Sequence, residues 1–201
     1  MSAFLRFYLC GHIMIGRLIK MKIWQLNFEV DLYDNLTSIP ELSVEELQSF
    51  DGRPHLPYWT PLHVVRMEPE KGLQLSDAPG FVFPVFSYRA LNCLKPLIEP
   101  NIEVLPLDCD EGKYFGINII TVLDAIDYEK SIYKTFRDGK RIMSFKKYSF
   151  IPNAVDGVPL FKITDEKVRY PFVSDAFKET VEKNKLTGFV FRLVWDSDKV
   201  D

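Results

Sequence analysis

The sequence predicts a single α+β domain with a mostly antiparallel β-sheet and two to three helices. Aromatic residues make up 14% of the 201 residues and proline contributes 13, a mixture that favours strands and ordered loops over a helical bundle. Short apolar segments alternate with turn signals along the chain, and three serine caps mark the starts of helices. No flexible linker separates these elements, so we expect one domain.

In the first half, apolar runs predict strands at residues 22–28, 63–67 and 80–83. Ser43-Val44-Glu45-Glu46 matches the S-x-x-E capping box and predicts a helix to about Phe50. Prolines make residues 53–61 an ordered extended loop, because each fixes φ and removes a donor. Ser87 starts a second helix, which Pro96 should end or kink.

In the second half, strands are predicted at residues 102–107, 114–122, 131–136, 141–151, 158–163 and 189–195. Asp138-Gly139 is the strongest hairpin signal in the chain. Ser174 caps a last helix that runs to about Asn184. In the final strand, we expect Phe189, Phe191 and Leu193 to share one face.

The N-terminal segment is expected to lie outside the domain. Basic residues interrupt its apolar run, so it fits neither a secretory signal nor a transmembrane span. We expect residues 1–20 to be an upstream extension, with an amphipathic surface helix or a degenerate targeting segment as alternatives, and the domain to occupy residues 21–196. Three cysteines without Cys-x-x-Cys spacing indicate reduced thiols in a cytoplasm.

The sequence contains no recognisable catalytic or metal-binding pattern, so we predict no catalytic residue, no metal and no cofactor. Glycines are scattered and form neither a phosphate loop nor a dinucleotide fingerprint. Cys10 and His12 are close in sequence but match no zinc spacing. The alternative is a small hydrolase that uses His55 or His63, for example His63 paired with Cys93.

Charge is distributed unevenly behind a formal net charge of -3. Residues 23–52, here called the acidic segment, contain no Lys or Arg and carry seven acids: Glu29, Asp31, Asp34, Glu41, Glu45, Glu46 and Asp51. Residues 130–147, the basic hairpin, carry seven basic residues and one acid. The two segments could be solvated faces, could pair with each other, or could form an electrostatic interface for a protein partner. A nucleic-acid site on the basic hairpin is a further alternative.

Several short blocks in the chain have a recognisable order and spacing. They are Phe83-Pro84-Val85-Phe86-Ser87 with Arg89-Ala90, Leu105-Pro106-Leu107, Tyr114 with Ile117-Asn118, Val122-Leu123-Asp124, Val173-Ser174-Asp175-x-Phe177 and Leu186-Thr187-Gly188-Phe189-x-Phe191-x-x-Val194-Trp195. Together they resemble bacterial polymorphic-toxin immunity protein family eleven, a myxobacterial-type domain formerly of unknown function. The resemblance spans about residues 21–195.

The resemblance implies a cytoplasmic binder, not an enzyme, that neutralises a cognate toxin encoded by a neighbouring gene. It implies no membrane or nucleic-acid partner, and it supplies no catalytic residues, because the matching positions look architectural. From the residues themselves, we expect the contact surface to combine the seven acids of the acidic segment with two exposed aromatics, Tyr58 and Trp59.

Overall fold

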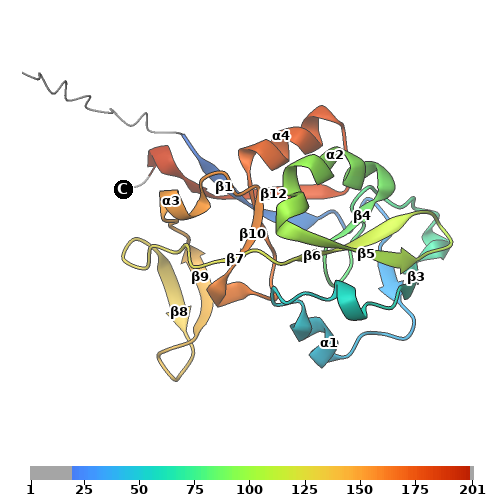
Figure 1. The fold of residues 1–201 in the computed structure, drawn as a ribbon, viewed down its shortest axis with the longest axis horizontal. Helices are drawn as coiled ribbons and strands as arrows, with labels where there is room; N and C mark the ends of the chain where they lie inside the picture. Colours follow the sequence, from blue (N-terminus) through green and yellow to red (C-terminus); the bar gives the residue numbers. More distant parts are fainter. Residues whose placement is uncertain (1–19, 200–201) are drawn as a thin grey trace, which may run out of the picture.

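The computed structural model describes residues 20–199, which form a single α+β domain (Figure 1). One five-stranded sheet contains, in order, β12 (Phe189–Asp196), β1 (Lys22–Phe28), β11 (Phe172–Ser174), β10 (Leu160–Ile163) and β7 (Val122–Leu123). The other contains β2 (Leu36–Ser38), β3 (Leu62–Arg66), β5 (Ile102–Asp108), β6 (Tyr114–Ile119) and β4 (Val85–Ser87). A separate hairpin joins β8 (Ile132–Thr135) to β9 (Ile142–Lys147).

Four α-helices complete the domain: α1 (Val44–Ser49), α2 (Tyr88–Ile98), α3 (Pro152–Val155) and α4 (Asp175–Lys183). The predicted fold class is confirmed, with α3 as one short helix more than expected. The predicted excess of antiparallel pairing is also confirmed, since the parallel strand pairs in the described residues are β10 with β7 and β3 with β5. The hairpin predicted at Asp138-Gly139 is present, and Gly139 has the positive φ of +66° that such a turn favours.

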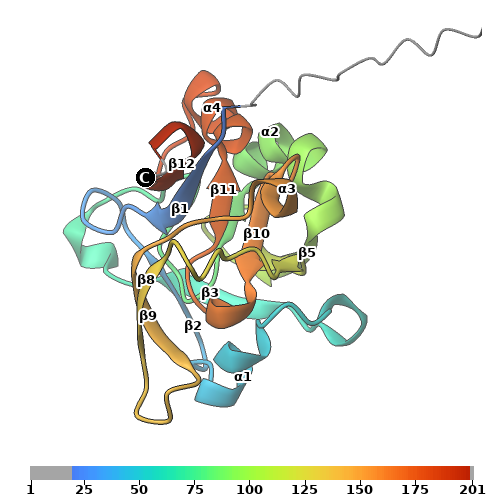
Figure 2. The ribbon, with the colours of Figure 1, turned by 90° about the vertical axis from the view of Figure 1, so that its left-hand side faces the viewer.

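Three clusters of buried side chains form the core. The largest joins both sheets to α2 and α4, which lie side by side in Figure 1 and Figure 2, and it includes Leu26, Phe86, Leu94 and Phe177. A second cluster contains Ile23, Phe161, Phe172 and Trp195. A third contains Leu36, Phe50, Val64, Phe83 and Leu105 from the second sheet and its loops. Strand alternation separates the first two clusters, because β1 contributes Leu26 to one and Ile23 to the other.

Two of the three predicted serine caps are formed and one is not. At α2 the Ser87 hydroxyl accepts from the Ala90 amide at 3.1 Å. At α1 the capping box is complete: the Ser43 hydroxyl accepts from the Glu46 amide at 3.2 Å, and the Glu46 carboxylate accepts from the Ser43 amide at 2.7 Å. Ser174 occupies the N-cap of α4, but its side chain makes no capping hydrogen bond. Asp175, the next residue, instead accepts the indole N–H of Trp24 at 2.7 Å.

The final strand keeps the predicted alternation as far as Leu193, because its register with β1 is unbroken from Phe189 to Leu193. Its two phenylalanines pack against the largest cluster as expected, but Leu193 is 40% exposed. Trp24 pairs with Leu193 while Ile23 pairs with Trp195, so β12 carries one extra residue at this point. Such a bulge reverses the faces of the residues beyond it, which places Trp195 in the second cluster.

Three other elements differ from prediction. Residues 80–83 form no strand; Pro84 has no amide donor for a ladder, and pairing with β6 begins at Val85. Helix α2 continues to Ile98, two residues past Pro96. The single strand expected at residues 114–122 divides into β6 and β7, because the intervening amides of Ile120 and Thr121 both donate to the carbonyl of Asn101.

A buried carboxylate connects two of the blocks that carry the family resemblance. Asp77 is 7% exposed, and its Oδ1 accepts from the Ser87 hydroxyl at 2.8 Å. Its Oδ2 accepts from Arg89 at 2.6 Å, from the Thr187 amide at 3.0 Å and from the Thr187 hydroxyl at 3.2 Å. The start of α2 and the turn before β12 are thus joined across the chain, which supports an architectural role for these residues.

Gly188 lies in the same turn and has no room for a side chain. Its φ is +86°, and a Cβ there would lie 2.1 Å from Ser76 Oγ and 2.6 Å from the Ala78 carbonyl oxygen. Gly188→Ala should therefore lower the free energy of unfolding by about 2–4 kcal/mol, through backbone strain and overpacking. Urea denaturation measures the loss. Gly72→Ala is the control, because Gly72 has a similar φ of +68° with nothing within 4 Å; equal losses would contradict the steric explanation.

Candidate partner-binding groove

Most acids of the acidic segment are exposed, as a contact surface requires. Asp31, Glu41, Glu45 and Glu46 are exposed, and Glu29 is half-buried. Within residues 20–199, the side chains of Asp31, Glu41 and Glu45 make no hydrogen bond or ion pair. Their charges are therefore free to act on a partner.

Asp34 does not belong to that surface, which corrects the expectation from sequence. It is 2% exposed, and it accepts from Arg66 Nε at 2.8 Å and from the amides of Asn35 at 2.8 Å and Glu68 at 3.0 Å. Although burial works in the opposite direction, these hydrogen bonds hold the pKa of Asp34 below its ordinary value. Asp51 is half-buried and accepts from Arg53 Nε at 2.9 Å.

The two aromatic candidates lie in different environments. Tyr58 is 92% exposed, in agreement with the prediction. Trp59 is half-buried, and the prediction that it is exposed is wrong. Its indole N–H donates to the carbonyl of Pro106 at 2.8 Å, and its ring meets the edge of Phe50 with 6.3 Å between centroids. Trp59 therefore packs against the third cluster, and Tyr58 alone remains accessible.

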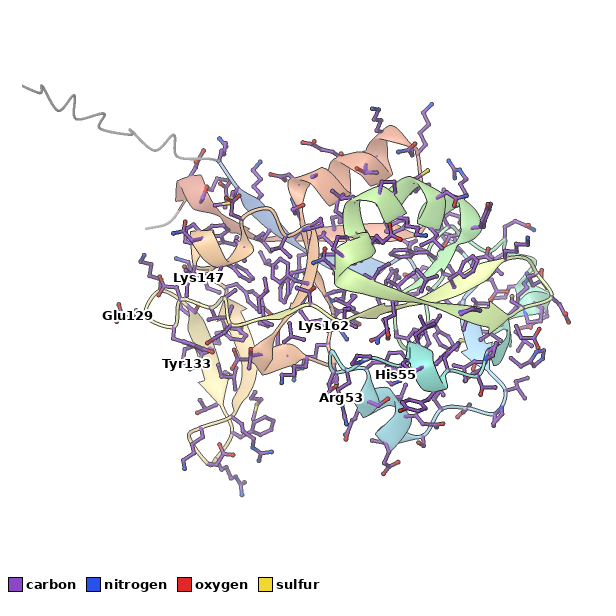
Figure 3. All side chains as sticks on the ribbon, viewed as in Figure 1. Arg53, His55, Glu129, Tyr133, Lys147 and Lys162 are labelled. Carbon is purple, nitrogen blue, oxygen red and sulfur yellow. The ribbon has the colours of Figure 1, made fainter. Side chains whose placement is uncertain are left out.

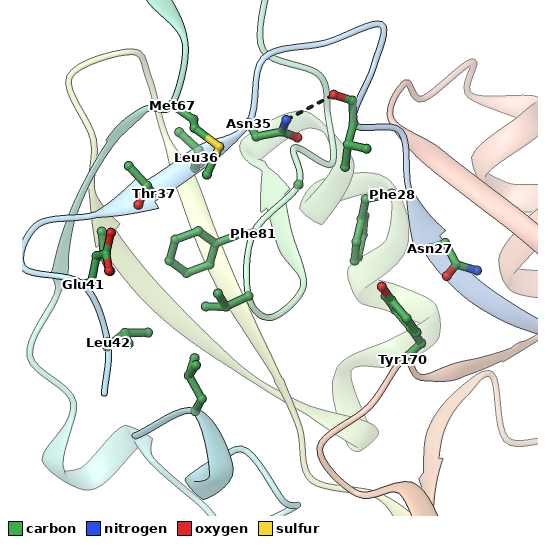
Figure 4. Close-up of a pocket in the computed structure, with 15 residues that line it drawn as sticks. Asn27, Phe28, Asn35, Leu36, Thr37, Glu41, Leu42, Met67, Phe81 and Tyr170 are labelled. Atoms are coloured by element: carbon green, nitrogen blue, oxygen red, sulfur yellow. Dashed lines mark hydrogen bonds between the residues drawn. The ribbon is translucent and has the colours of Figure 1, made fainter. Parts of the chain in front are cut away.

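An apolar groove of about 690 Å³ opens beside the acidic segment (Figure 4). Glu41 lines it, together with Asn35, whose Nδ2 donates to the Val30 carbonyl at 3.2 Å. The Oδ1 of Asn35 is buried and has no hydrogen-bond partner in the described part of the chain. The apolar lining comes from separate segments and includes Phe28, Leu36, Leu42, Leu47, Phe81 and Val82.

A second cavity of about 340 Å³ extends this groove inward. The two share five lining residues, Phe28, Leu47, Phe81, Val82 and Tyr170, and so form one continuous groove with an outer and an inner part. The inner part adds Phe50, Phe83, Lys162 and Arg169 to the lining. The groove thus has a carboxylate in its outer part and two cationic side chains in its inner part.

Lys162 is the most unusual charged group in the groove. It is 5% exposed, and its ammonium donates to the carbonyl of Phe50, the residue that ends α1. Desolvation lowers the pKa of Lys162 to about 8, with a smaller opposing attraction from Asp51. Figure 3 shows Lys162 next to the segment that carries Arg53 and His55. Among residues 20–199, no carboxylate forms an ion pair with this ammonium.

The groove leaves much apolar surface in contact with water. Five of its lining side chains are more than half exposed: Val30, Met67, Val82, Val168 and Tyr170. A contiguous apolar patch with a polar border is a common mark of an interaction site on a folded domain. These residues were missed from the sequence, because the segments around residues 30, 67, 82 and 170 meet only in the fold. The available signal was large apolar residues in predicted loops, such as Val30, Val168 and Tyr170.

The His63–Cys93 pair given as an example of the hydrolase alternative is not formed. His55 stacks on Phe50, and its Nε2 lies 3.0 Å from the carbonyl oxygen of Ser49 and 3.4 Å from its hydroxyl. That hydroxyl already donates to the Glu46 carbonyl at 2.6 Å. His63 pairs at the surface with Asp108 at 3.1 Å, whereas Cys93 packs against the largest cluster. Neither histidine lines the groove.

The basic hairpin projects from the rest of the domain (Figure 1, Figure 2). Every residue of β8 is exposed, and Figure 3 labels Tyr133 and Lys147 on the hairpin. Its ion pairs are local, between Lys130 and Asp127 and between Arg141 and Asp138. Within the described part of the chain, no ion pair joins the hairpin to the acidic segment, so the two charged segments do not neutralise each other there.

Two further observations concern residues 20–199. Nowhere in this range do three or more His, Cys, Asp or Glu side chains gather in a way that could hold a metal ion. The helices of the same range are too short or too polar to cross a membrane. Residues 1–19, which include Cys10, His12 and most of the predicted extension, lie outside the described residues.

Comparison with known families agrees with the resemblance seen in the sequence. Residues 103–196 match the model of a family described as "Immunity protein family (Imm11)". None of the curated proteins matches the chain. The matched range begins in β5 and ends with β12, so it includes Lys162 and Tyr170 but not the acidic segment or residues 80–82. The family match therefore covers the second half of the domain, while most of the groove lining precedes it.

Proposed function

We propose that this chain, whose residues 103–196 carry the immunity-protein pattern, binds a cognate bacterial toxin and neutralises it without catalysing a reaction. The protein acts in the cytoplasm of the producing cell, and its folded unit comprises residues 21–196. The observation that carries the proposal is the exposed apolar groove beside free carboxylates, in a chain that matches this family. It has the composition of a protein interface, with apolar anchors inside a charged border.

The chemistry of the groove defines the surface that it would accept. Its outer part is apolar and is lined by Glu41, while Asp31 follows the lining residue Val30 and Glu45 lies two residues before the lining residue Leu47. We therefore expect the complementary toxin segment to have apolar side chains flanked by Lys or Arg. Complementary charge would speed the encounter and fix the orientation, and the buried apolar side chains would supply most of the affinity.

Charge reversal tests this proposal directly. Reversing the free acids, as Asp31→Lys, Glu41→Lys and Glu45→Lys together, should weaken binding to the toxin encoded by the adjacent gene by about 10-fold or more, mainly through slower association. The fold should be retained, because these side chains have no partners within residues 20–199. Association is measured by surface plasmon resonance at two salt concentrations, and protection is measured as survival of cells that co-express the toxin.

The matched control reverses three other exposed acids, as Glu129→Lys, Asp156→Lys and Glu179→Lys, which changes the net charge equally but away from the groove lining. If both triple variants lose affinity alike, net charge and not this surface controls binding. If the wild-type protein gives no protection from the toxin, the proposed function itself is wrong.

A further inference from the structure

The geometry points to a carboxylate-binding site in the inner part of the groove, formed around Lys162, that receives an acidic side chain of the docked toxin segment. That the carboxylate comes from the toxin rests on the proposed function. That the site binds a carboxylate rests on the residues around Lys162 alone. The ligand class is a carboxylate carried on an apolar or aromatic group.

The first support is the incomplete coordination of Lys162. An ammonium carries three N–H donors, and in the described structure one of them is used, by the Phe50 carbonyl. Because Lys162 is only 5% exposed, water has little access to its other two N–H donors. A buried cation without an ion-pair partner is costly, whereas a carboxylate from a ligand would supply both countercharge and acceptors.

The second support is that this cation lies at a cavity and not inside a sealed core. Lys162 and Phe50 both line the inner part of the groove, whose volume of about 340 Å³ suits a side chain or a small organic acid. By strand alternation, Lys162 shares the face of β10 that carries Leu160, opposite Phe161 and Ile163. The strand therefore directs the lysine away from the second cluster.

The neighbouring charges leave this site available to an anion. Asp51 is the acid that attracts Lys162, but its carboxylate is already bound by Arg53 at 2.9 Å. Arg169 also lines the inner part, and its charge is shared with Glu166 at 3.0 Å. Phe83 and Pro171 supply the apolar surface on which the rest of such a ligand would pack.

A purely structural role for Lys162 makes different predictions. In that role, the lysine holds the end of α1 to β10 through the Phe50 carbonyl, so its removal would destabilise the fold and the cavity would show no preference for anions. As a ligand site, the lysine carries a desolvation cost in the free protein. Lys162→Met, which keeps the apolar stem and removes the charge, should then leave the urea midpoint unchanged or raise it.

The test uses two small probes of nearly equal shape, 3-phenylpropionate and its neutral analogue 3-phenylpropionamide. Each is titrated into the full chain at neutral pH, and binding is followed through the amide NMR shifts of Phe83, Lys162 and Tyr170. The carboxylate should bind at least about 10-fold more tightly than the amide, because a charge-assisted hydrogen bond at a desolvated site is strong. Lys162→Met should remove that difference, whereas Lys147→Met, on the exposed hairpin, should preserve it.

Equal binding of the two probes to the wild-type chain, or no saturable shift with either, would overturn the inference even if Lys162→Met failed to fold. A destabilised Lys162→Met variant that keeps the carboxylate preference would also overturn it. Carboxylate binding without toxin neutralisation would leave the site intact and remove only the proposed function. Neutralisation without carboxylate binding would leave the proposed function intact and overturn the carboxylate site.

Discussion

Asp77→Ala is expected to lower the free energy of unfolding by about 3–5 kcal/mol, because it removes a buried charged acceptor that four donors share. The side chain of Asp77 is the common partner of Ser87, Arg89 and Thr187. After truncation, the Thr187 amide and the Ser87 hydroxyl lose their acceptor in a part-buried environment. The change therefore weakens the start of α2 and the turn before β12 together.

Urea denaturation followed by far-UV circular dichroism measures this loss. Asp156→Ala is the control, because the Asp156 side chain is exposed and has no partner within residues 20–199, and its midpoint should match that of the wild type. Asp77→Asn should fall between the two, since an amide oxygen still accepts but the charge is lost. An Asp77→Ala protein as stable as the wild type would show that this junction does not hold the domain together.

Val82→Arg should weaken toxin binding by about 100-fold or more, the effect expected when a central anchor position of an interface is lost. Val82 is 59% exposed and lines both parts of the groove. An arginine there would fill the apolar space and would repel a segment flanked by basic residues. Because the side chain of Val82 is already largely exposed, the fold should tolerate the change.

Isothermal titration against the toxin measures the affinity. Val190→Arg is the matched control, because Val190 is also an exposed valine, 38% accessible, but lies on β12 and does not line the groove. The control should bind as the wild type does. If Val82→Arg retains full affinity, then the toxin contacts another surface.

Local patterns in the sequence predicted much of the fold. The capping box at Ser43 and the hairpin at Asp138-Gly139 appear as expected, because their hydrogen bonds and backbone angles are set by neighbouring residues. The prediction failed where a distant contact decides the outcome. The strand expected at residues 114–122 divided because the amides of Ile120 and Thr121 donate to the carbonyl of Asn101, and β12 took an extra residue opposite β1.

The candidate site was predicted only in part, for the same physical reason. A run of acids without basic residues can be recognised from the sequence alone, so the acidic segment was predicted. Whether each acid is exposed depends on tertiary partners, and Arg66 buries Asp34 from 32 residues away. Lys162 has no distinguishing feature in the sequence, because its burial and its contact with Phe50 arise only when β10 lies beside the end of α1.

Amide hydrogen exchange on the complex with the adjacent-gene toxin tests the central claim, that the groove is the toxin-binding face. Binding there should slow exchange in residues 36–38, 80–83 and 168–170, which line or border the groove, and should leave residues 132–147 of the basic hairpin unchanged. Protection confined to the basic hairpin, with the groove segments exchanging as in the free protein, would contradict the account.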